Sequence, residues 1–179
     1  LGVPNVWKRW WSQAHPANQL IFVIDKKSGK VAWTYRPKHA VASSAIAIDG
    51  GKLFLIEGRP RFHFLRKKAD ASKMPEQRTL RALDVGSGEK LWHTSDLGVD
   101  QGSLWVRSGV VLATLTSDTH APFRLGRRGF PGPRGPRVTA FSAEDGALLW
   151  EKSKRTGACA PVMTDDTVYL PHAYSLQTG

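Results

Sequence analysis

The sequence has little cysteine, no long apolar run and a shortage of acidic residues, and each shortage excludes a class of protein. Its 179 residues include a single cysteine, Cys159, so the chain cannot form an internal disulfide. The histidines lie far apart and show no zinc-ligand spacing, so no metal site is expected. No apolar run approaches the roughly 20 residues that a helix needs to cross a bilayer. We therefore expect neither a disulfide scaffold, nor a zinc domain, nor a transmembrane helix.

The charge balance is strongly basic. The chain has 26 Lys and Arg against 15 Asp and Glu, a formal net charge of +11. Such an excess favours an anionic partner but does not identify it. No nucleic-acid-binding motif is present, so nucleic acid is not expected as that partner. The 41% hydrophobic and 23% charged composition is typical of a globular domain.

An internal repeat dominates the sequence. Residues 23–33 end in Ser-Gly-Lys-Val-Ala-Trp, and the same arrangement recurs at 82–92 and at 140–150, with glycine and tryptophan in matching places. The offsets are 59 and 58 residues. A fourth copy begins at 173, which leads us to expect that the chain is part of a longer repeat protein.

A second recurring element lies between these copies. Apolar residues alternate around Asp49-Gly50-Gly51, around Ser108-Gly109 and, more loosely, around Asp165-Asp166. Alternation around a tight turn is typical of a hairpin of half-buried strands. Each repeat is therefore expected to hold two hairpins, which is four antiparallel strands.

Four strands per repeat and a period above 40 residues predict an all-β fold made of β-propeller blades. Residues 1–179 are expected to form a partial propeller of about three four-stranded blades. The tryptophan that closes each copy has the bulk to fill the space between two blade sheets. The glycine before it can adopt the positive φ of a tight turn, and an aspartate at the turn can cap backbone N–H groups.

The repeat motif, written A-x-D-x-x-[T/S]-G-x-x-x-W, resembles the tryptophan-docking motif of pyrroloquinoline quinone (PQQ)-like propeller repeats. The resemblance implies an eight-bladed parent and a periplasmic or otherwise extracytoplasmic location. It does not imply the cofactor, because the family includes both quinoprotein alcohol dehydrogenases and BamB-like propellers that bind no quinone. The residues assigned to the structural motif are Asp25, Gly29, Trp33, Asp84, Gly88, Trp92, Gly146 and Trp150.

Two basic insertions hold most of the net charge. Residues 57–79 and 116–137 separate the second and third strands of successive repeats, and each carries a net charge of +4. Equivalent connections emerge on the same side of a propeller, so a common basic face is expected. It is read either as an anion-binding face or as ordinary solvated loop charge. The candidate anion-binding residues are Arg66, Lys67, Lys68, Arg127, Arg128 and Arg134.

The sequence assigns no catalytic residue. A PQQ dehydrogenase needs a carboxylate base and oxygen ligands for a divalent cation, and that set cannot be placed here. By resemblance, enzymes of the family also carry a disulfide between adjacent cysteines, which Cys159 alone cannot form. No cofactor is evident from the residues, and PQQ with a cation enters by resemblance only.

Two functions from different classes follow. The first is a noncatalytic propeller module, a scaffold or binding surface in an extracytoplasmic bacterial protein. Its partners would be the remaining blades of the parent chain and a protein or polyanion bound by the basic loops. The alternative is part of a PQQ-dependent oxidoreductase that acts on alcohols or sugars.

Overall fold

The computed structural model describes residues 17–18, 20–37, 41–58, 79–94, 97, 101–116, 137–153, 161–170 and 173–175. These residues form fourteen β-strands. Since they contain no helix, nothing in this part of the chain offers a helical membrane span.

One complete blade is formed by four consecutive strands. They are β4 (Val41–Asp49), β5 (Lys52–Glu57), β6 (Thr79–Asp84) and β7 (Lys90–His93). Each strand pairs antiparallel with the next, in the order β4-β5-β6-β7. A short strand that the sequence did not predict, β1 (Ala17–Asn18), extends this sheet beyond β4.

A second complete blade repeats this arrangement. It consists of β8 (Gln101–Arg107), β9 (Val110–Thr116), β10 (Arg137–Ser142) and β11 (Leu148–Ser153). The strand order β8-β9-β10-β11 matches that of the β4–β7 blade. In both blades the long insertion joins the second strand to the third, as predicted.

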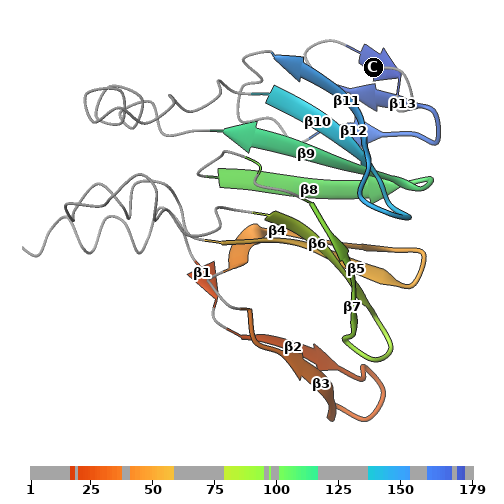
Figure 1. Ribbon diagram of the computed structural model, residues 1–179. Coiled ribbons are helices and arrows are strands. Elements are labelled where there is room, and N and C mark those ends of the chain that lie inside the picture. Colours follow the sequence, from red (N-terminus) through yellow and green to blue (C-terminus); the bar gives the residue numbers. More distant parts are fainter. Residues whose placement is uncertain are drawn as a thin grey trace, which may run out of the picture.

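Two partial sheets flank the complete blades (Figure 1). On one side lies a hairpin of β2 (Ile21–Ile24) and β3 (Val31–Tyr35). On the other lies a three-stranded sheet of β12 (Val162–Met163), β13 (Thr167–Tyr169) and β14 (Ala173–Ser175). Only residues 170–172 separate β13 from β14, so the third blade lacks the long insertion.

Three hydrophobic cores join these sheets in series. The first lies between the β2–β3 hairpin and the β4–β7 blade and includes Tyr35 and Leu53. The second joins the two complete blades through residues such as Phe54 and Phe141. The third joins the β8–β11 blade to the β12–β14 sheet and includes Val168. The described chain is therefore a row of packed blades.

Packing on both faces corrects one expectation. The second strand of each blade was predicted to be half-buried, yet every residue of β5 from Leu53 to Glu57 is buried. Leu53 and Leu55 pack into the first core, whereas Phe54 and Ile56 pack into the second. A blade between two others has no solvated face, so its inner strands are apolar at successive positions. The all-β class and the four-stranded antiparallel propeller blades are confirmed.

Candidate functional site

The repeat motif forms the junctions between blades. The turn after β2 is capped by Asp25, whose Oδ1 accepts hydrogen bonds from the backbone N–H of Lys27 at 3.1 Å and of Ser28 at 2.7 Å. Asp84 does the same after β6, with Ser87 N at 2.7 Å and Ser87 Oγ at 2.9 Å. These bonds lower the pKa of both carboxyls, with the Ser28 and Ser87 N–H groups as the largest causes. The two aspartates have the capping role expected of them.

The third copy caps two of the same backbone N–H groups with its side chains exchanged. Ser142 stands where the other copies have aspartate, and its Oγ accepts from the N–H of Glu144 at 3.2 Å. Asp145 stands where they have serine, and its Oδ1 accepts from the N–H of Ala147 at 3.1 Å. The exchange keeps these two caps and the backbone bonds of the turn, so the degenerate motif still specifies the same local structure.

Each motif glycine adopts the left-handed conformation, with φ of +68° at Gly29, +77° at Gly88 and +76° at Gly146. At two of them the backbone also meets a tryptophan of the preceding sheet. A Cβ on Gly88 would lie 2.8 Å from Cε3 of Trp33, and one on Gly146 would lie 2.6 Å from Cε3 of Trp92. Only glycine allows this approach together with this φ.

The tryptophans also hydrogen-bond across the junction. Trp33 Nε1 donates to the Val85 carbonyl at 2.8 Å, and Trp92 Nε1 donates to the Ala143 carbonyl at 3.3 Å. Both side chains are half-buried, and Trp150 is 7% exposed in the third core. Trp92 and Phe54 also pack with their ring centroids 5.8 Å apart. The contact with Phe54 lies within one blade, whereas the indole N–H bond and the contact with the motif glycine join tryptophan to the next sheet.

A buried ionic cluster lies where the first insertion leaves its blade. Glu57, the last residue of β5, is 5% exposed and accepts a hydrogen bond from the Tyr35 hydroxyl at 2.6 Å. Arg81 Nη2 lies 2.9 Å from Glu57 Oε1. Burial and the neighbouring Glu57 carboxylate raise the pKa of Tyr35 far above its ordinary value, so the phenol stays protonated and donates. The cluster ties β3 to the β4–β7 blade.

A second ionic cluster lies where the other insertion returns. Arg137, the first residue of β10, is 2% exposed, and its Nε lies 2.8 Å from Glu151 Oε2. Its Nη2 donates to the Leu97 carbonyl, which precedes the β8–β11 blade. The Thr139 hydroxyl donates to the same carboxylate at 3.3 Å. Arg137 therefore ties β10 to β11 and to the connection between the two complete blades.

These two clusters correct the extent of the insertions. Glu57 and Arg137 were counted with the loop charge, but both are buried strand residues in ion pairs. Removing one acid from the first insertion and one base from the second leaves their combined net charge unchanged. The six candidate anion-binding residues all lie outside the described part of the chain, as does Cys159.

Both ionic clusters were missed in the sequence, although in each the acid and the base could have been found from their positions on paired strands. In each, the acid and the base lie on neighbouring strands, two positions out of register: Thr79 pairs with Glu57, and Ser153 pairs with Arg137. Opposite charges at such diagonal positions reach one another. Their further partners carry no sequence signal, because Tyr35 comes from the neighbouring hairpin and Leu97 from the connection between β7 and β8.

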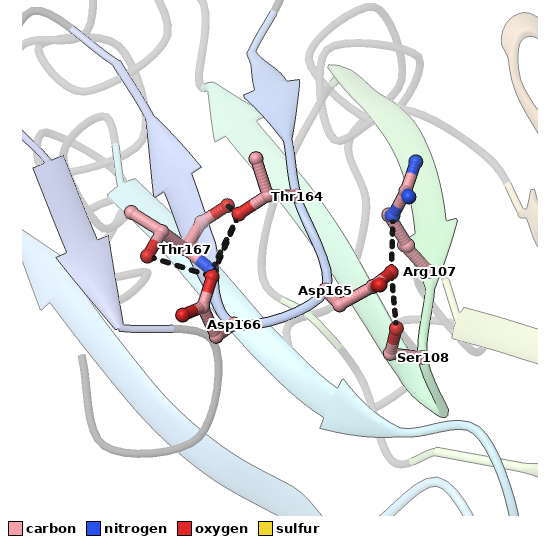
Figure 2. Close-up of polar contacts among 6 residues, drawn as sticks. All are labelled: Arg107, Ser108, Thr164, Asp165, Asp166 and Thr167. Carbon is pink, nitrogen blue, oxygen red and sulfur yellow. Dashed lines mark hydrogen bonds and ion pairs between the residues drawn. The ribbon is translucent and has the colours of Figure 1, made fainter.

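An exposed polar clamp joins the turns of the last two sheets (Figure 2). Arg107 Nε lies 2.8 Å from Asp165 Oδ1, and the Ser108 hydroxyl donates to the same oxygen at 3.1 Å. Asp166 accepts from the hydroxyls of Thr164 at 2.8 Å and Thr167 at 3.1 Å. These bonds lower the pKa of both carboxyls, that of Asp165 chiefly through Arg107. The clamp holds its turns in place with both carboxylates ionised.

Within the described ranges, no group of three or more His, Cys, Asp or Glu side chains is arranged to hold a metal ion. The aspartates discussed above are committed to turns and to the clamp, and Glu57 and Glu151 to ion pairs. The described residues therefore form junctions between blades. An ionic cluster lies at the end of β5, where the first basic insertion begins, and another at the start of β10, where the second insertion ends.

Comparison with solved structures finds the same fold in a BamB protein and in a designed protein. BamB from Moraxella catarrhalis matches with a TM-score of 0.57 and 14% identity over 89% of this chain and 41% of that one. The computationally designed Ika8 protein matches with a TM-score of 0.53 and 13% identity, over 89% of this chain and 38% of that one. The quinohemoprotein alcohol dehydrogenase of Comamonas testosteroni aligns at a TM-score of 0.46 and 21% identity, over 74% of this chain and 18% of that one. This chain thus spans less than half of each structure. No curated protein matches it.

The family comparison covers nearly the whole sequence. The model described as "Outer membrane protein assembly factor BamB" matches twice, at residues 14–120 and at residues 76–175. The two matches overlap, as they would on a tandem repeat, and together they include all three complete copies of the motif. The chain therefore belongs to the BamB family of PQQ-like β-propeller repeat proteins.

Proposed function

We propose that this chain is a noncatalytic PQQ-like propeller module that serves as a scaffold and binding surface in an extracytoplasmic bacterial protein. The observation that carries the proposal is the family match at residues 14–120 and 76–175 to an outer membrane protein assembly factor. The carboxylates of the blade junctions also support it, because those described here cap turns or form ion pairs and so have structural roles. The extracytoplasmic location is proposed from the same family.

The binding surface is proposed to be the face from which the two basic insertions leave. The insertions join equivalent strands, β5 to β6 and β9 to β10, and equivalent ends of adjacent blades lie at the same side of a propeller. β9 ends and β10 begins at the left of Figure 1. The expected ligand is an acidic protein surface or another polyanion, because Arg66, Lys67, Lys68, Arg127, Arg128 and Arg134 lie within these insertions.

Heparin chromatography tests this surface. The wild-type chain is expected to elute at a higher salt concentration than R127E/R128E, because bound counterions are released and exposed charges are screened over about 8 Å at physiological ionic strength. The charge-reversed chain should unfold at nearly the same denaturant concentration, since surface charges contribute about 0–1 kcal/mol. As a matched control, Lys26 and Lys27, which lie in an exposed turn outside the two insertions, are both replaced by glutamate. Elution of wild type and R127E/R128E at the same salt concentration would contradict the binding surface and would mean that the insertions carry ordinary solvated charge.

The second candidate function is part of a PQQ-dependent oxidoreductase. It is favoured by the repeat itself, which resembles that of the quinoprotein alcohol dehydrogenases. It would require a base, cation ligands and a cofactor platform in other blades of the parent protein. Adjacent cysteines in those blades would favour the enzyme over the scaffold.

A further inference from the structure

We propose that the free edge of β8 at Gln101–Ser103, the side of the strand that faces away from β9, is a docking site for an extended acidic segment of a partner polypeptide. The segment adds to the sheet as a further β-strand. This inference rests on the proposed binding surface at the insertion face. It adds the place of the site on the fold, the conformation of the partner and the backbone bonds that hold it.

The neighbouring blade shows this kind of pairing at the equivalent place. β1 pairs antiparallel with β4 at Val41 and Ala42, on the side of β4 that faces away from β5. Val41 pairs with the last residue of β5, and Gln101 pairs with the last residue of β9, so the two strands begin in the same register. The edge at Gln101–Ser103 therefore corresponds to the edge that β1 occupies.

The same edge of β8 carries no strand in the part of the chain that the structure describes. β8 is the terminal strand of its sheet, in the order β11-β10-β9-β8. The terminal strand of a sheet presents a row of backbone N–H and C=O groups to one side. These groups are the hydrogen-bond partners that an added strand requires.

The other terminal strands of the two complete blades are protected against pairing, whereas β8 is not. β7 and β11 each have a β-bulge directly before the tryptophan, with Leu91 and Leu149 as the extra residues. Bulges at sheet edges discourage pairing with another chain. β8 pairs with β9 from Gln101 to Arg107 without a register shift, and it has no proline and no charged residue before Arg107. A regular, uncharged edge of this kind accepts an added strand.

Small residues at the start of β8 let another backbone come close. Gly102 has no side chain, and a glycine inside a strand often marks a close approach of a ligand or another backbone. Ser103 is small and partly exposed. The next residue, Leu104, is 5% exposed and packs into the second core. The start of β8 therefore combines an anchored strand with an accessible backbone.

The charge at this end of the molecule selects an acidic segment. Gln101 pairs with Thr116, where the second basic insertion begins, so β8 starts on the insertion side, at the left of Figure 1. The two insertions each carry a net charge of +4, out of +11 for the whole chain. A partner segment rich in Asp and Glu is attracted to this side before its backbone pairs with β8.

Hydrogen exchange of the full-length protein, followed by mass spectrometry, tests the proposal. The probe is a peptide of four Val-Glu repeats, which is acidic and favours an extended strand. It should slow the exchange of backbone N–H groups in residues 101–107, because those on the free edge gain hydrogen-bond partners, and leave β7 unchanged. A peptide of four Pro-Glu repeats has the same charge but lacks the proline N–H donors, so it should leave residues 101–107 unchanged.

Two proline variants give an independent readout. Neighbouring residues of a strand direct their N–H groups to opposite sides, so one of Gly102→Pro and Ser103→Pro removes a donor on the free edge and the other removes a bond to β9. The variant whose denaturation midpoint stays closer to wild type lacks the outward donor. It should bind the Val-Glu peptide about 2- to 10-fold more weakly, as the loss of one hydrogen bond predicts.

Three results would overturn the proposal. They are equal protection of residues 101–107 by the two peptides, protection by neither peptide, and wild-type affinity in the variant that lacks the outward donor. Heparin retention depends on the charge of the insertions and not on the N–H groups of β8, so it should be the same in wild type and in that variant. Failure of this inference is therefore distinguishable from failure of the proposed function.

Discussion

At the residue scale, a tryptophan and a glycine from neighbouring sheets meet at two junctions, Trp33 with Gly88 and Trp92 with Gly146. The glycine supplies a left-handed turn with no side chain in the path of the indole ring, and the tryptophan supplies apolar area and a donor. The capping positions can exchange their residue types, as Ser142 and Asp145 do, because either side chain supplies an oxygen that accepts a backbone N–H bond. All three copies keep tryptophan at its position.

Truncating Trp92 to alanine should therefore cost about 3 kcal/mol of unfolding free energy, the lower end of the range for large-to-small core substitutions. The change removes the contact with Phe54 and leaves the Ala143 carbonyl without the indole donor. Urea denaturation followed by circular dichroism measures it. Leu91→Ala is the matched control, because Leu91 directly precedes Trp92 on the same strand and is 46% exposed. Equal losses for the two variants would contradict the junction role of Trp92.

The capped turns predict how stability depends on pH. The pKa of Asp25, Asp84 and Asp145 is lowered in the folded protein from an ordinary value of 3.8. Their contribution is therefore fully present above pH 3.8 and is lost as the pH falls through the lower, folded values. Denaturation midpoints measured from pH 6 to pH 2 should fall across that window. Asp84→Asn keeps an acceptor but cannot titrate, so its midpoint should fall less steeply; an unchanged slope would contradict the assignment.

At the element scale, each of the two complete blades packs against a sheet on both faces and has an ion pair at one end. The apolar strands β5 and β9 bury successive residues because a sheet packs on each side. Glu57 with Arg81, and Arg137 with Glu151, place ionic clusters among these apolar surfaces. A buried ion pair adds little net stability over an apolar pair of similar volume, but breaking one is costly. These clusters therefore fix where the strands end, at the points where the insertions leave and return.

Replacing Arg81 by methionine should cost about 3–5 kcal/mol, because it leaves the Glu57 carboxylate buried without its cation. The double variant E57L/R81M should recover most of that loss, since no unpaired charge remains. Denaturant titration of both single variants and the double variant measures the coupling. Arg107→Met is the control, because its pair with Asp165 is exposed and should contribute about 0–1 kcal/mol. Additive losses at Glu57 and Arg81 would contradict the buried pair.

At the scale of the whole molecule, the repeat predicted much of the fold, and the unpredicted contacts come from packing between blades. The offset between Gly29, Gly88 and Gly146 was sufficient to predict three equivalent turns, because a turn depends on neighbours in sequence. The bonds from Tyr35 to Glu57 and from Arg107 to Asp165 could not be predicted, because they depend on how separate sheets face one another. Glu57 was assigned to a loop for the same reason, because a charged residue is expected to be solvated unless partners such as Tyr35 and Arg81 are known.

The central claim at this scale is our proposal that the chain is a noncatalytic propeller module. A PQQ assay of the full-length protein tests it most directly. The protein is titrated with PQQ in the presence of calcium, and dye-linked oxidation of alcohols and sugars is followed in the same samples. We predict no saturable PQQ binding and no turnover above the rate without protein. Saturable binding together with turnover that disappears when the cation is chelated would contradict the claim and identify the protein as a quinoprotein dehydrogenase.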